Sequence, residues 1–219
     1  MKVLVLDNNR DPEWFGASDL TTHVASAGPV EVHVRRGPEC DFPKLEFFDA
    51  IVISGSKTSC RSSEPWVDEF DRYLKSGMDL KIPMLGVCFG HQSIARVLGG
   101  RDVLGRAQIP EIGWTRIEVL KNDPLFEGLG SEFYTYSSHY EEISKLPPQM
   151  ENFARSKDCA NQATRIPELG IYTVQFHPER SLAQGDQSIQ TRYQAGERAG
   201  ILGRGEGKIQ SVSFSKLVS

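Results

Sequence analysis

The chain lacks the features that would place it outside the ordinary globular classes. Only four of its 219 residues are cysteine and none forms a C-x-x-C pair, so neither a disulfide framework nor a zinc site is expected. The longest early apolar run, residues 3–6, is too short for a signal sequence or a membrane span. A basic surplus is also missing, because the net charge is −4. We therefore expect a cytoplasmic protein that has neither a nucleic-acid nor a membrane partner.

Length and composition favour one large domain followed by a short tail. With 39% apolar and 25% charged residues, a chain of 219 can bury a core without covalent cross-links. No repeat or low-complexity linker interrupts residues 1–180, which we expect to form a single domain. Residues 181–219 differ, because they are rich in glycine and carry more basic than acidic side chains. We expect them to form a basic tail of uncertain structure.

The first hundred residues alternate between strand-like and helix-like segments. Runs rich in Val, Ile and Leu predict buried strands, and apolar residues at helical spacing predict the segments between them. This alternation is typical of a parallel sheet with helices on both faces. The expected strands are 2–6, 30–34, 48–53 and 82–87, and the expected helices are 21–27, 65–77 and 89–98.

The second half changes character, because its strand-like segments alternate apolar and polar residues and have no helices between them. Such segments are typical of antiparallel strands. We therefore expect an α/β fold, with a flavodoxin-like, mostly parallel sheet, helices on both faces and added antiparallel strands. The segments concerned are 114–120, 133–136, 154–157, 163–166 and 171–176.

The strongest chemical signal is a cysteine between two glycines, where a buried strand is expected to turn into a helix. Cys88 lies between Gly86 and Gly90. A nucleophile on such a turn is lifted out of the sheet, and small neighbours let the backbone pass. Amides at the new helix N-terminus favour negative charge and can hold an oxyanion. Taken alone, the pattern also fits a buried structural cysteine.

A second motif supplies a base for this nucleophile. His177 and Glu179 follow the last predicted strand. Residues two apart in an extended chain point to the same side, so Glu179 is expected to orient the His177 imidazole. A cysteine, a histidine and a carboxylate together are what nucleophilic acyl transfer requires. The pair of motifs is therefore much more specific than either one.

Several segments together give the chain a resemblance to the class I (triad) glutamine amidotransferases. Residues 86–92 resemble the family's nucleophile elbow, and residues 175–179 resemble its base motif. Residues 53–56 resemble the family's oxyanion loop, and residues 137–139 resemble its glutamine-binding loop. Residues 110–114 and 161–163 resemble the branch that is similar to the amidotransferase domain of GMP synthase.

The resemblance implies roles for the three residues of the triad. Cys88 would attack the carboxamide carbon of glutamine and form a γ-glutamyl thioester. His177 would move the protons, and Glu179 would hold its tautomer. We therefore expect neither a metal nor a cofactor at this site.

Five further positions take roles from the same resemblance. Backbone amides of Gly55 and Phe89 would stabilise the oxyanion. Gln92 would fix the substrate together with the backbone of Ser138 and His139.

The motifs leave three functions open. The first is a glutaminase subunit that supplies ammonia to a separate, ATP-using synthetase, because no phosphate-binding loop is recognisable. Gly207-Lys208 lacks the other residues of one. The second is a stand-alone hydrolase of γ-glutamyl amides or peptides. The third is a non-catalytic regulatory module, which has no physical need for an intact triad.

Overall fold

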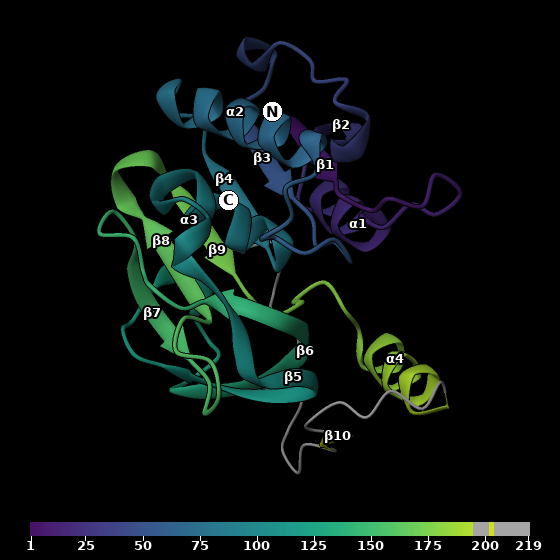
Figure 1. Cartoon of the computed structure of the whole chain (residues 1–219), viewed down its shortest axis with the longest axis vertical. Coiled ribbons are helices and arrows are strands. Elements are labelled where there is room, and N and C mark those ends of the chain that lie inside the picture. Colours follow the sequence, from purple (N-terminus) through teal and green to yellow (C-terminus); the bar gives the residue numbers. More distant parts are fainter. Residues whose placement is uncertain (195–201, 204–219) are drawn as a thin grey trace.

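All described strands form one mixed sheet, ordered β10-β5-β7-β8-β9-β4-β3-β1-β2, with β6 paired to β5. Figure 1 shows this computed structural model, which describes residues 1–194 and 202–203. The strands are β1 (Lys2–Asp7), β2 (Glu31–Arg36), β3 (Ala50–Ile53), β4 (Met84–Val87), β5 (Leu104–Val119), β6 (Glu132–Ile143), β7 (Glu151–Arg155), β8 (Ala163–Ile166), β9 (Ile171–Val174) and β10 (Leu202–Gly203). The helices are α1 (Ser18–Ser26), α2 (Pro65–Asp79), α3 (Phe89–Gly99) and α4 (Leu182–Gln194).

One half of the sheet is parallel and carries helices on both faces, as the sequence predicts. Strands β2, β1, β3, β4 and β9 pair in parallel. Alternate side chains of β1 point to opposite faces because the side-chain period of a strand is two residues. Leu4 and Leu6 join the apolar cluster of α2 and α3, whereas Val3 and Val5 join the cluster of α1. The carboxyl ends of these parallel strands therefore lie between the layer of α2 and α3 on one face of the sheet and α1 on the other.

The other half is mostly antiparallel, through the pairs β9–β8, β8–β7, β7–β5 and β5–β6, and only the short β10 pairs with β5 in parallel among the described strands. Its long pair, β5 and β6, extends well beyond the predicted segments 114–120 and 133–136. The additional part of β5 contains Gly105 and Pro110, which have low strand propensity. Its pairing is irregular between Arg106 and Glu111, around the proline. Pairing between the two long strands outweighs local propensity here.

Helix α4 lies inside the segment predicted to be a tail. Its apolar pattern is sparse, and tertiary contacts hold it instead. It packs so closely on Trp114 that a Cβ at Gly185 would come within 2.5 Å of the indole ring. The Trp114 indole N–H donates to Asp186 at 2.9 Å, and Gln184 donates to Asp19 at 3.1 Å. The glycine-rich residues beyond α4 lie largely outside the described part, and a domain boundary at residue 180 stays a prediction.

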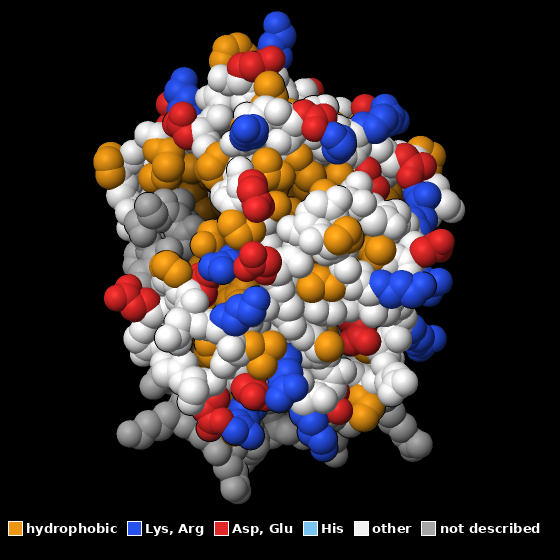
Figure 2. Space-filling model, turned by 90° about the vertical axis from the view of Figure 1, so that its left-hand side faces the viewer, with side chains coloured by type: hydrophobic (Ala, Val, Ile, Leu, Met, Phe, Trp, Pro, Cys, Tyr) orange, Lys and Arg blue, Asp and Glu red, His pale blue; other side chains and the backbone are white. Residues whose placement is uncertain are grey.

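The exposed charges of the described residues are mixed in sign. Figure 2 shows acidic and basic side chains interspersed over one face, with no large area of either sign. Within residues 1–194 and 202–203, no helix is long and apolar enough to span a bilayer.

Candidate active site

Cys88 occupies a strained turn between β4 and α3. Its backbone angles are φ 52° and ψ −100°, a region that residues with a side chain rarely occupy. A Cβ at Gly86 would come within 2.8 Å of the Gly90 backbone, and one at Gly90 within 2.6 Å of the Ile53 carbonyl. Both glycines are therefore required by close packing, which agrees with the predicted elbow. Strain at the turn that carries a nucleophile is characteristic of functional sites.

His177 and Glu179 lie beside this turn and bind each other. His177 Nδ1 is 2.7 Å from Glu179 Oε1. The extended chain predicted here is wrong, because β9 ends at Val174 and residues 178–179 form a turn. The backbone N–H of His177 donates to the backbone carbonyl of Tyr136 at 2.7 Å, which fixes the position of the histidine against β6. The turn, rather than strand alternation, brings the carboxylate to the ring.

The charges of this group reinforce one another. Burial by itself would lower the pKa of His177, but the negative charges of Glu179 and Cys88 and hydrogen bonds to both raise it well above 6.5. Burial would raise the pKa of Glu179, whereas the His177 charge and its hydrogen bond hold that pKa below 4.5. The site therefore favours a His177 imidazolium paired with the Glu179 carboxylate and lying beside Cys88.

The backbone of Gly55 lies against the reacting groups. A Cβ at this position would be 3.0 Å from His177 Cε1 and 3.5 Å from Cys88 Cβ. Asn8 holds the loop of Gly55 in place through its backbone. The backbone N–H donates to Ser54 Oγ at 2.9 Å, and the backbone carbonyl accepts from Ser56 Oγ at 2.7 Å. The sequence did not predict this role of Asn8, because the only indication was its position in a polar turn directly after β1. Phe89, the other predicted oxyanion residue, begins α3 directly after Cys88.

Of the predicted substrate residues, Gln92 and Ser138 lie near the nucleophile. Cys88 Sγ is 4.0 Å from the Ser138 carbonyl oxygen. The Gln92 amide is buried and donates to the Glu141 carbonyl at 2.6 Å and to Gln175 Oε1 at 2.9 Å. These bonds link the elbow helix to β6, the strand that carries Ser138.

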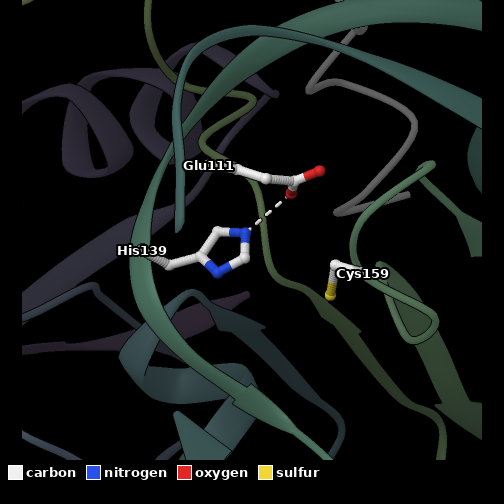
Figure 3. Close-up of side chains that lie close together, drawn as sticks. All are labelled: Glu111, His139 and Cys159. Carbon is white, nitrogen blue, oxygen red and sulfur yellow. Dashed lines mark hydrogen bonds and ion pairs between the residues drawn. The ribbon is translucent and has the colours of Figure 1, made fainter. Parts of the chain in front are cut away.

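The side chain of His139 points elsewhere, into a buried polar cluster. Figure 3 shows its ring against Glu111, with Cys159 beside them; Nε2 lies 2.8 Å from Glu111 Oε2. The other ring nitrogen is 3.1 Å from the Glu141 carbonyl. Both nitrogens are thus occupied within the protein, so only the backbone of His139 is left for a substrate.

The same cluster has side chains that can ligate metals. Ligand atoms of Glu111, His139 and Cys159 lie within 4.8 Å of one another. However, Glu111 already accepts hydrogen bonds from His139, Gln162 and Ser156. Burial raises the pKa of the Cys159 thiol well above 9.0, so this sulfur keeps its proton. Hydrogen bonding accounts for the proximity of these groups, and we assign no ion to them.

The remaining histidine of the elbow is structural. His91 is fully buried, with Nδ1 2.6 Å from Thr173 Oγ1 and Nε2 3.0 Å from the Asn161 carbonyl. Burial lowers its pKa to about 3, so the ring is neutral. It fastens α3 to β9 and to the loop before β8.

Comparisons with known proteins show the family of this chain. The family model for glutamine amidotransferase class-I matches residues 18–193. The chain is 39% identical over 145 residues to a glutamine-hydrolysing GMP synthase subunit of Pyrococcus abyssi, covering 66% of this chain and 76% of that protein.

Solved structures share the fold. A GMP synthase subunit of Thermoplasma acidophilum superposes with a TM-score of 0.70 at 25% identity, over 90% of this chain and 98% of that one. A glutamine amidotransferase of Thermotoga maritima gives 0.73 at 20% identity, over 90% of this chain and 84% of that one. With a strained cysteine turn, a paired base and a family match over most of its length, this chain belongs to the class I glutamine amidotransferases.

Proposed function

We propose that this protein is the glutaminase subunit of a two-component GMP synthase, hydrolysing L-glutamine and passing ammonia to a separate synthetase subunit. The observation that carries the chemistry is the group formed by Cys88, His177 and Glu179, with the Gly55 backbone against the first two. The acceptor reaction is supported by similarity to the glutamine-hydrolysing subunits of GMP synthases.

The first half of the reaction forms a thioester. The Cys88 thiolate attacks the carboxamide carbon of glutamine, and the carbonyl π electrons move to the oxygen. The amides of Gly55 and Phe89 donate to this oxyanion. Protonated His177 gives its proton to the departing nitrogen as the carbon–nitrogen bond breaks. Ammonia and a γ-glutamyl thioester result.

The second half releases glutamate. His177, now neutral, takes a proton from water, and the resulting hydroxide attacks the thioester carbon. The carbon–sulfur bond breaks and the thiolate is restored beside the imidazolium. Glu179 holds the ring in one tautomer through both halves, since its carboxylate accepts from Nδ1.

The decisive experiment measures ammonia and glutamate released by the purified chain from L-glutamine, first without any partner and then with a GMP synthase synthetase subunit, ATP and the nucleotide acceptor. We expect slow release without the partner, faster release with the synthetase, and GMP formed in proportion. Cys88→Ala should lower the rate about a millionfold, the size of effect seen on removing an enzyme nucleophile.

Two results would contradict the proposal. Rapid hydrolysis of γ-glutamyl dipeptides without any partner would identify a self-sufficient γ-glutamyl hydrolase. Unchanged activity in Cys88→Ala would remove the thioester mechanism altogether.

A further inference from the structure

A second feature of the site comes from helix α4, which carries an arginine to Ser138, the residue of β6 that lies beside Cys88. Arg192 lies in the last turn of α4. Its guanidinium donates to Ser138 Oγ at 2.9 Å and to the Tyr140 hydroxyl at 3.3 Å. Ser138 is also the residue whose carbonyl oxygen lies 4.0 Å from Cys88 Sγ. One residue of β6 thus touches both the nucleophile and the arginine.

The position of Arg192 is set by contacts at the other end of its helix. Gly185 packs on the Trp114 ring and Asp186 accepts from its indole N–H. Arg180, just before the helix, pairs with Asp19 of α1 at 3.1 Å. These contacts fix α4 against both β5 and α1, so Arg192 reaches β6 from a helix that is anchored independently of it.

The geometry of glutamine places its charged end near this arginine. When the carboxamide carbon meets Cys88 Sγ, the α-carbon lies about 4 Å further on, from three carbon–carbon bonds of about 1.5 Å. The α-carboxylate extends beyond that point. The Ser138 carbonyl oxygen is 4.0 Å from the sulfur, and the Oγ of the same residue binds the guanidinium. A planar guanidinium beside Ser138 suits this carboxylate, because guanidinium and carboxylate groups pair through charge-assisted hydrogen bonds.

We infer that Arg192 binds the α-carboxylate of the γ-glutamyl substrate, and that Ser138 holds the guanidinium ready for it. The inference rests on the proposed glutaminase chemistry at Cys88. It makes Arg192 a specificity determinant: the site selects amides of glutamate with a free α-carboxylate over simple amides of similar length. Because the arginine lies on α4, the C-terminal part of the chain takes part in substrate selection.

The test compares two reagents that alkylate the same sulfur in the full-length chain. 6-Diazo-5-oxo-L-norleucine is a glutamine analogue that keeps the α-carboxylate, whereas iodoacetamide has none. Rates of Cys88 alkylation are measured by intact-mass spectrometry. In Arg192→Gln, alkylation by the analogue at low concentration should fall about ten- to a hundredfold, the range expected for a lost hydrogen bond to a charged group. The iodoacetamide rate should stay the same.

Matched variants separate binding from folding. Arg192→Lys keeps the charge without the fork and should recover part of the loss. Arg116→Gln removes an exposed arginine that pairs with Glu132 on β6, and should behave like the original chain. Equal losses with both reagents, or no loss with the analogue, would overturn the role of Arg192 and leave the glutaminase proposal intact. Failure of the analogue to alkylate Cys88 in the unmodified chain, with the synthetase present, would overturn both.

Discussion

The parallel and antiparallel halves of the sheet contribute different things to one site. The parallel half is stabilised by apolar packing on both faces, and it presents the nucleophile on a strained turn at the carboxyl end of β4. The antiparallel half buries polar groups instead, around Glu111 and His139, and presents the strand that carries Ser138. Apolar packing thus holds the strained turn of Cys88, whereas a buried hydrogen-bonded network adjoins the strand of Ser138.

The largest effect should come from removing the ion pair between His177 and Glu179. Glu179→Gln removes the charge that raises the pKa of His177, so that burial then lowers it. We expect the glutaminase rate to fall about a hundred- to ten-thousandfold, the usual contribution of a positioned acid–base group. The pH above which the glutaminase rate declines should move down, because the Glu179 charge no longer raises the pKa of the proton donor His177. An unchanged pH profile would show that Glu179 only orients the ring.

The same variant tests the sign of the stability change with pH. The folded pKa of His177 is raised above 6.5, so its contribution is complete below pH 6.5 and is lost as the pH rises through the folded value. The folded pKa of Glu179 is lowered, so its contribution is complete above pH 4.5 and is lost as the pH falls through the folded value. The difference in melting temperature between the original chain and Glu179→Gln should therefore be greatest between pH 4.5 and 6.5.

A smaller effect should come from the buried network of the antiparallel half. Glu111 and Glu118 both lie on β5; Glu111 is buried against His139, whereas Glu118 pairs with Arg155 at the surface. Glu111→Gln should cost about 3 kcal/mol in urea unfolding, because it removes the charged acceptor of a buried hydrogen-bonded group. It should also raise the KM for glutamine more than it lowers kcat.

Glu118→Gln is the matched control for that variant, and its stability and KM should stay unchanged since exposed pairs contribute little. Equal behaviour of the two variants would show that the buried cluster around Glu111 contributes no more than an exposed ion pair.

The smallest effect concerns the strain itself. At φ 52° a glycine avoids the steric cost that any side chain pays at this turn. Cys88→Gly should therefore be more stable than Cys88→Ala by about 1 kcal/mol, at the lower end of the cost of a strained residue. Thermal unfolding of the two inactive variants measures this directly. A less stable glycine variant would show that the turn holds no strain.

Much of the parallel half could be predicted because its signals are local. Apolar runs, a proline at the start of α2 and paired glycines around Cys88 are readable without knowledge of the rest of the chain. Helix α4 and the long inner part of β5 could not be predicted in this way, because distant partners such as Trp114 and the paired strand β6 stabilise them. Segments with weak propensity form structure only when a partner supplies the packing.

The sequence by itself determined the kind of chemistry. Its cysteine motif and its histidine–glutamate motif each follow a predicted strand, and those residue types together indicate nucleophilic acyl transfer. Only the tertiary structure decided which side chains face that chemistry. The His139 side chain points into a buried polar cluster beside Glu111. Arg192, from the segment predicted to be a tail, reaches Ser138. The physical reason is that a side chain's direction depends on what packs against it, and those neighbours come from elsewhere in the chain.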